Sequence, residues 1–222
     1  MLHAAICHTT SKDYIQYIAA KLPAAAKVAA LPDAGFFMDN DFSRASGWVT
    51  AQQWVFANHN CSSGVPQTCL ARYPEPEHWK CFFAQYVAPL IKTPTFALNG
   101  IHDSYQIGAE LKSTDPAAVN AYGSNLSATV VAELLSTPAN GAFLDGCEHH
   151  GGDWPGLLAG GVEAWTAFDA WYHGTAAKQQ LWKNSSAFPC KECCHCATAA
   201  GCATGCKRVG SSLPSTGYVH SK

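Results

Sequence analysis

Short apolar runs that end in polar turns recur along this chain and alternate with segments of helical periodicity. Residues 95–98 form one such run and end at Asn99-Gly100, residues 141–144 form another, and a third, residues 28–31, stops at Pro32. We predict buried strands at these runs. Helices are predicted at residues 10–22, 48–57, 81–91, 116–136 and 156–173. Strands that alternate with helices predict an α/β fold, with a parallel sheet flanked by helices.

The size and charge of the chain narrow the choice of partner. With 222 residues, 48% of them hydrophobic, the chain can bury a core and fits one domain better than two. Its 14 Lys and Arg face 16 Asp and Glu, and no stretch collects a block of like charge. We therefore expect no nucleic-acid partner and no attraction to an anionic membrane. No apolar run approaches the roughly 18 residues of a membrane span.

Eleven cysteines are many for a chain of this length and suit an oxidising compartment. Three N-glycosylation sequons, at Asn60, Asn125 and Asn184, point the same way. We therefore expect a secreted glycoprotein. The first residues carry no signal peptide, so we also expect the true start to lie upstream of Met1. The odd cysteine is either a free buried thiol or paired outside this chain, and Cys61 and Cys69 could staple the loop at 60–78.

The predicted strands also locate the candidate chemistry. In open parallel sheets catalytic groups gather in the loops at the carboxyl ends of strands, and two such loops hold Asp103 and His150. An acid followed by a histidine matches the second and third places of an α/β-hydrolase triad. The first place is empty, because no G-x-S-x-G pattern occurs in the sequence.

Other interpretations of these residues stay open on spacing alone. An Asp in a turn after glycine is often an Asx turn or a helix cap, which applies to Asp103. His149 and His150, with Asp153 nearby, could form a metal site or only a polar loop.

Several motifs spread in order over residues 1–206 carry a resemblance to a known family. They are Leu31-Pro32-Asp33-Ala34-Gly35-Phe36-Phe37-Met38-Asp39, Cys81-Phe82-Phe83, Ile91-Lys92-Thr93-Pro94 with Leu98-Asn99, Cys147 three residues before His150, Phe168-Asp169-Ala170-Trp171-Tyr172, and Phe188-Pro189-Cys190. Together they resemble the pectinacetylesterase and Notum family. The resemblance implies an α/β-hydrolase-like fold with a Cys-rich C-terminal tail.

Carried over residue by residue, the resemblance makes Asp103 the triad acid and His150 the triad base. The family's nucleophile is a serine in a Gly-x-Ser-Ala-Gly-Gly elbow, followed by a helix with a Leu-His pair that Leu2-His3 resembles. We therefore expect the serine, the first strands and the oxyanion loop to lie upstream of Met1. No metal and no cofactor are implied.

The segment around Asp33, Gly35 and Phe36 follows the strand after the elbow helix and is expected to line the substrate pocket. A packing turn is an equally good interpretation. In that case Gly35 would supply an unusual backbone angle and the rings of Phe36 and Phe37 would fill the core.

Residues 1–184 are predicted to form an incomplete esterase domain, residues 185–209 its Cys-rich tail, and residues 210–222 a disordered end. The tail spacings Cys190-x-x-Cys193 and Cys202-x-x-x-Cys206, with His195, could suit zinc, but a secreted protein favours disulfides.

The function that this resemblance implies is serine-type ester hydrolysis, with an acetylated pectin or a related cell-wall polysaccharide as the substrate. We expect a secreted monomer of the cell wall. The alternatives are a Notum-like protein deacylase and a non-catalytic pseudoenzyme or binding module.

Overall fold

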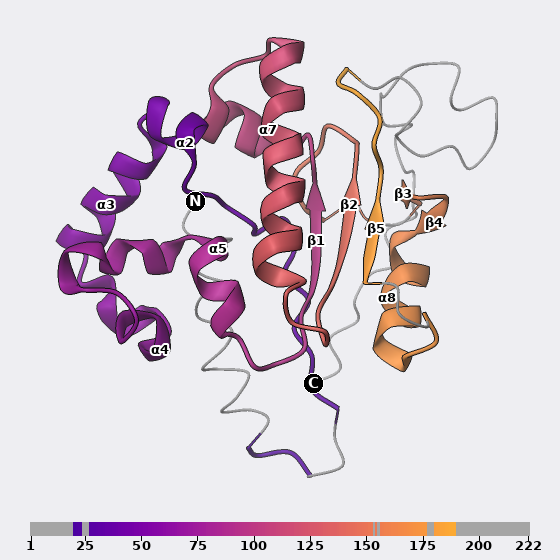
Figure 1. The fold of residues 1–222 in the computed structure, drawn as a ribbon, viewed down its shortest axis with the longest axis horizontal. Helices are drawn as coiled ribbons and strands as arrows, with labels where there is room; N and C mark the ends of the chain where they lie inside the picture. Colours follow the sequence, from indigo (N-terminus) through magenta and orange to yellow (C-terminus); the bar gives the residue numbers. More distant parts are fainter. Residues whose placement is uncertain (1–19, 24–26, 153, 155, 177–179, 190–222) are drawn as a thin grey trace, which may run out of the picture.

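The computed structural model describes residues 20–23, 27–152, 154, 156–176 and 180–189. Its centre is a parallel sheet of three strands in the order β1-β2-β5, which confirms the predicted α/β class (Figure 1). The strands are β1 (Phe96–Gly100), β2 (Gly141–Asp145) and β5 (Leu181–Lys183). The first two coincide with predicted strands. The third has only three residues, too few for a periodic signal, and was not predicted.

The predicted strand at 28–31 lies beside β1 but is irregular. Isolated parallel bridges join Ala30 to Thr95 and Asp33 to Leu98, so the segment extends the sheet beyond β1. Pro32 has no N–H to donate, and Leu31 is exposed. The segment therefore contributes carbonyl acceptors to the sheet, with Leu98 N donating to Pro32 O, but forms no regular strand.

Side chains of the sheet alternate between two faces, and each face is covered by a helix. One face packs under α8 (Ala164–His173) and the other under α7 (Pro116–Thr129), which runs alongside β1 in Figure 1. The α8 face carries Phe96, Leu98, Phe143 and Trp182; the α7 face carries Ala97, Ala142 and Leu144. The alternation follows from the two-residue period of a strand, and burial on both faces explains the uninterrupted apolar runs.

A helical region fills the chain between the 28–34 segment and β1. The predicted helix at 48–57 is confirmed as α3, whereas the predicted helix at 81–91 is broken by an extended Phe83 and by Pro89. The helices here are α2 (Asp41–Ala45), α3 (Trp48–Asn58), η1 (Cys61–Gly64), α4 (Gln67–Leu70), η2 (Glu75–Phe82), α5 (Ala84–Val87) and η3 (Ala88–Leu90). Beyond β1, α6 (Ser104–Gln106) continues into η4 (Ile107–Leu111), and α7 continues into η5 (Val130–Leu134), as predicted for 116–136.

The predicted helix at 156–173 is wrong in its first half. Only α8 is helical, and the residues before it form an antiparallel hairpin of β3 (Leu158–Ala159) and β4 (Val162–Glu163). Gly160 and Gly161 have φ of 60° and 78°, the conformation that a tight two-residue hairpin turn requires. The glycine pair was a turn signal within an apparent helical period.

The expected staple between Cys61 and Cys69 is also wrong. Cys69 forms a disulfide with Cys81, and both are fully buried in the helical region. Cys61 is half-buried, and its Sγ lies 3.6 Å from the carbonyl of Val55. Both candidate partners lie close to Cys69 in sequence, so spacing could not choose between them.

Removing this disulfide should lower stability measurably. It closes a loop of 12 residues, for which loop-closure entropy predicts about 3 kcal/mol in the free energy of unfolding. We expect a Cys69→Ser/Cys81→Ser double variant to lose about that amount in urea denaturation. Cys61→Ser is the matched control and should change the midpoint little; an equal loss in both would contradict the assignment.

Several predictions fall outside the described residues. They are most of the helix at 10–22, the Leu2-His3 pair, the cysteines from Cys190 onward with His195, and the end at 210–222. The start of the tail is attached to the domain, because the Asn120 side chain on α7 bonds to both N and O of Phe188, at 2.8 and 3.0 Å. The boundary at 184 stays a prediction.

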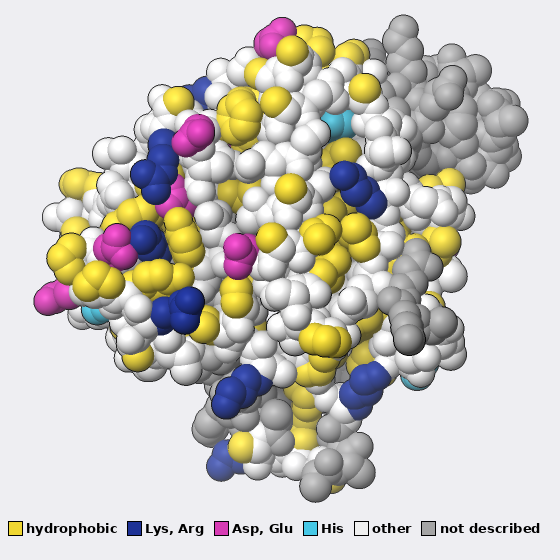
Figure 2. All heavy atoms as spheres, viewed as in Figure 1, with side chains coloured by type: hydrophobic (Ala, Val, Ile, Leu, Met, Phe, Trp, Pro, Cys, Tyr) yellow, Lys and Arg dark blue, Asp and Glu magenta, His cyan; other side chains and the backbone are white. Residues whose placement is uncertain are grey.

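On the face drawn in Figure 2, basic and acidic side chains lie scattered among neutral ones. That face presents no continuous basic surface. None of the helices in the described part of the chain is both long and apolar enough to cross a membrane.

Candidate active site

The candidate active site lies at the carboxyl ends of β1 and β2. Because β1 and β2 are parallel and in register from Phe96↔Gly141 to Gly100↔Asp145, the loops that follow them leave the sheet side by side. Ser104 N donates to His149 O at 3.0 Å and ties the two loops together. This arrangement brings together Asp103 and His150, which are 47 residues apart in the sequence.

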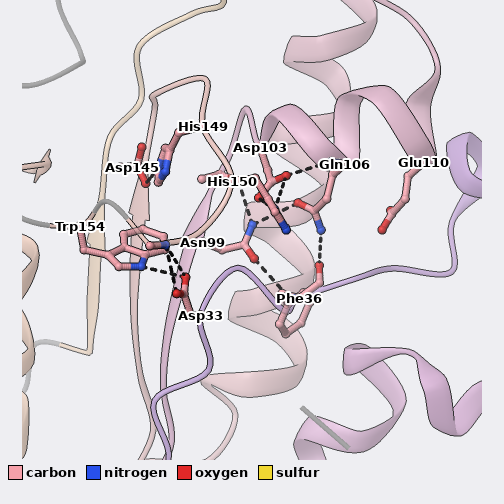
Figure 3. A network of polar contacts seen from close by, with 12 residues as sticks. Asp33, Phe36, Asn99, Asp103, Gln106, Glu110, Asp145, His149, His150 and Trp154 are labelled. Atoms are coloured by element: carbon pink, nitrogen blue, oxygen red, sulfur yellow. Dashed lines mark hydrogen bonds and ion pairs between the residues drawn. The ribbon is translucent and has the colours of Figure 1, made fainter. Parts of the chain in front are cut away.

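Asp103 and His150 form a direct pair (Figure 3). His150 Nδ1 lies 2.8 Å from Asp103 Oδ2 and 3.0 Å from Oδ1. Asp103 also caps α6, because its Oδ1 accepts from Gln106 N at 2.9 Å. The helix-cap interpretation and the histidine-partner interpretation of Asp103 therefore hold together. The cap fixes the carboxylate, and the carboxylate fixes the ring.

The carboxylate is fully buried, whereas the His150 side chain is 32% exposed. With Nδ1 donating to Asp103, the other ring nitrogen, Nε2, keeps its lone pair. The hydrogen bond to Asp103 raises the pKa of His150 above its ordinary value of 6.5, against an opposing effect of burial. The rings of Tyr105 and Phe37 lie 5.0 and 6.5 Å from the imidazole. The site thus combines an oriented base with an aromatic wall.

A buried amide network supports the acid. Asn99, at the end of β1, accepts from Phe36 N through Oδ1 at 3.2 Å and donates to Gln106 Oε1 at 3.1 Å. Gln106 Nε2 donates to Phe36 O at 2.8 Å. Both amides are fully buried, and neither was predicted to belong to the site. The available signals were an Asn inside an apolar strand and a Gln three residues after the capping Asp.

The neighbouring histidine has its own carboxylate. His149 Nε2 lies 3.1 Å from Asp145 Oδ2, and Asp145 Oδ1 accepts from Cys147 N at 2.8 Å. The two histidines therefore face different acids, unlike ligands of one metal ion. Within the described residues, no three His, Cys, Asp or Glu side chains gather as they would around a metal. Asp153 lies outside those residues.

The three predicted pocket residues have different surroundings. Asp33 is exposed and bonds through its carboxylate to the loop after His150, whereas Phe36 is fully buried in the core under α7. The expected unusual backbone angle at Gly35 is wrong, because Ala34 carries it, with φ of 49°. Phe37 is also buried and faces Tyr105 and His150. Phe36 contributes its backbone to the amide network described above.

A further buried acid close enough to Asp103 to interact with its charge is Glu110, in η4. Tyr122 OH donates to its Oε2 at 2.6 Å, and its Oε1 has no hydrogen-bond partner among the described residues. Burial raises the pKa of Glu110 to about 8. The folded protein therefore keeps this carboxyl neutral at pH 7.

Glu110 should make stability fall as the pH rises. An unfolded chain ionises this carboxyl near pH 4.5, but the folded chain does so only near pH 8, so folding loses free energy across that window. At pH 8 we expect Glu110→Gln to have a free energy of unfolding higher than that of wild type by on the order of a few kcal/mol, and so a higher melting temperature. At pH 4.5 we expect the two proteins to be about equally stable. Calorimetry at both pH values measures this. The control Glu133→Gln should follow wild type; a Glu110→Gln variant less stable at pH 8 would contradict the prediction.

Comparison with known proteins adds a family match to this geometry. A family model described as pectinacetylesterase matches residues 8–195. Pectin acetylesterase 7 of Arabidopsis thaliana is 29% identical over 195 residues, which cover 72% of this chain and 48% of that protein. Pectin acetylesterase 11 of the same plant is 32% identical over 151 residues, which cover 58% of this chain and 38% of that protein.

A second group of relatives consists of palmitoleoyl-protein carboxylesterases, and NOTUM of Drosophila melanogaster is 22% identical over 165 residues, 68% of this chain and 23% of that protein. The palmitoleoyl-protein carboxylesterase NOTUM of Mus musculus is 29% identical over 87 residues, 36% of this chain and 17% of that protein. The chain thus spans less than half the length of the curated relatives described here.

Proposed function

The chain belongs to the pectinacetylesterase family, and from this premise we propose that it supplies the acid and the base of a serine-type carboxylic ester hydrolase. The observation that carries the proposal is the 2.8 Å contact between a fully buried Asp103 and the Nδ1 of a partly exposed His150. In this proposal the nucleophilic serine lies upstream of Met1. The complete protein means this chain together with that upstream segment.

The proposed reaction runs in two halves. The serine hydroxyl attacks the ester carbonyl while His150 Nε2 takes its proton, and upstream backbone N–H groups stabilise the oxyanion. The imidazolium then gives the proton to the departing alcohol, which leaves an acyl-serine. A water molecule, deprotonated by His150, attacks that ester, and the imidazolium returns the proton to the serine oxygen as the carboxylic acid leaves. Asp103 keeps Nδ1 protonated and stabilises the imidazolium throughout.

For the substrate we propose an acetylated pectin or a related cell-wall polysaccharide. The two plant pectin acetylesterases are 29% and 32% identical over 72% and 58% of this chain, whereas NOTUM of Drosophila melanogaster is 22% identical over 68%. The higher identity over comparable lengths favours a polysaccharide ester over a fatty-acylated protein. A secreted, glycosylated protein would meet such a substrate in the cell wall, and the buried disulfide supports an oxidising compartment.

A comparison of two substrates tests the proposal. The complete protein is incubated with acetylated pectin and, separately, with a palmitoleoylated serine peptide, and acetate and free peptide are measured. We expect acetate release and little deacylation of the peptide. Deacylation of the peptide alone would favour the Notum-like alternative, and no release from either by a folded protein would favour the pseudoenzyme.

A further inference from the structure

The chain immediately after His150 has little stiffness of its own. Gly151 and Gly152 follow the histidine directly, with φ of 59° and 75°. Glycine loses more conformational entropy on ordering than any other residue. Something outside these two residues must therefore hold this side of the histidine loop.

Asp33 makes the contacts that could hold it (Figure 3). Gly152 N lies 3.1 and 3.3 Å from the two carboxylate oxygens, and Trp154 Nε1 donates to Oδ1 at 2.8 Å. A Cβ placed on Gly151 would lie 3.3 Å from the same Oδ1. The carboxylate therefore lies directly against the two glycines that follow His150.

Both partners of this contact are anchored elsewhere. The residues on both sides of Asp33 bond to Leu98 of β1: Leu98 N donates to Pro32 O at 3.0 Å, and Ala34 N donates to Leu98 O at 2.8 Å. Trp154 is 2% exposed, and its ring packs against His149 at 5.0 Å. Asp33 thus joins the edge of the sheet to the part of the loop after His150, whereas Asp103 and Asp145 bind the two histidines themselves.

We propose that Asp33 is a positioning residue that holds the His150 loop through the amide of Gly152 and the indole of Trp154. This inference rests on the proposed function, and it replaces substrate contact as the role of Asp33. The negative charge of Asp33 also favours the imidazolium, together with Asp103, whereas His149 opposes it. Because Asp33 is exposed, solvent screens that charge, and the main effect is on loop geometry.

Kinetics of the complete protein separate positioning from substrate contact. We expect Asp33→Ala to lower kcat about tenfold to a hundredfold, with KM changed less than about twofold. Asp33→Asn keeps an oxygen acceptor for the indole and should recover part of kcat. Trp154→Phe should lower kcat less, and adding it to Asp33→Ala should lower kcat no further, because both act through one contact. A higher KM at unchanged kcat, or independent effects, would overturn the proposal.

A readout without catalysis tests the contact itself. The indole N–H signal of Trp154, identified by its loss in Trp154→Phe, is followed by NMR with its hydrogen-exchange rate. We expect Asp33→Ala to shift this signal and speed its exchange, whereas the exposed carboxylate control Asp169→Ala does neither. An unchanged indole signal in Asp33→Ala would overturn the inference. Absence of acetate release by wild type would instead count against the proposed function, and the indole signal would still decide the contact.

Discussion

Replacing His150 by alanine in the complete protein is expected to lower kcat/KM for acetate release by about 10³- to 10⁴-fold. The variant loses the group that takes the serine proton and returns it to the leaving alcohol. His150 is partly exposed and lies outside the hydrophobic clusters, so the fold should survive. Acetate release from acetylated pectin, with circular dichroism of each variant, measures both effects.

His149→Ala is the matched control for this loss. It removes an adjacent imidazole that faces Asp145 and not Asp103. We expect kcat/KM to fall by less than about tenfold, because His149 supports the loop but transfers no proton. Equal losses in the two variants would mean that the choice of His150 over its neighbour is wrong.

Asp103→Asn should lower kcat by about 10²- to 10⁴-fold, nearly as much as the loss of His150, although the side chain keeps its size. An amide can donate to Nδ1 and so stabilise the wrong tautomer of His150. It also removes the main cause of the raised pKa of His150. In wild type, activity should fall as the pH drops through the raised pKa of His150, above 6.5. In the variant, the same fall in the residual activity should occur at a lower pH.

Asp145→Asn provides the comparison for this variant. It replaces another fully buried carboxylate at the end of the neighbouring strand, and keeps an acceptor for Cys147 N. We expect a smaller loss of kcat and an acid limb like that of wild type. A normal kcat in Asp103→Asn would exclude Asp103 as the triad acid.

The positions of Asp103 and His150 in the structure could be predicted because they depend on strands that are easily recognised. The apolar runs before them are buried on both faces, so their pattern in the sequence is strong. Parallel strands end at one edge of a sheet, and the 2.8 Å pairing across that edge follows from β1 and β2 being neighbours. The family resemblance, and not the spacing, favoured catalytic roles for these two residues.

The supporting contacts depend on tertiary structure that spacing does not encode. Asn99 and Gln106 join Phe36 only because β1 lies beside the 30–34 segment. Asp33 meets Trp154 across 121 residues of sequence. Locally, Gly160-Gly161 forms a turn where the period of the flanking apolar residues suggested a helix, and Cys69 pairs with Cys81 because the helical fold brings them together.

The most direct test of the central claim is acetate release from acetylated pectin by three proteins: this chain, the complete protein, and the complete protein with its elbow serine replaced by alanine. We expect release only by the complete protein. That result would mean that Asp103 and His150 act on a serine upstream of Met1. Equal release by the serine variant, or no release by a folded complete protein, would contradict the assignment of a serine esterase.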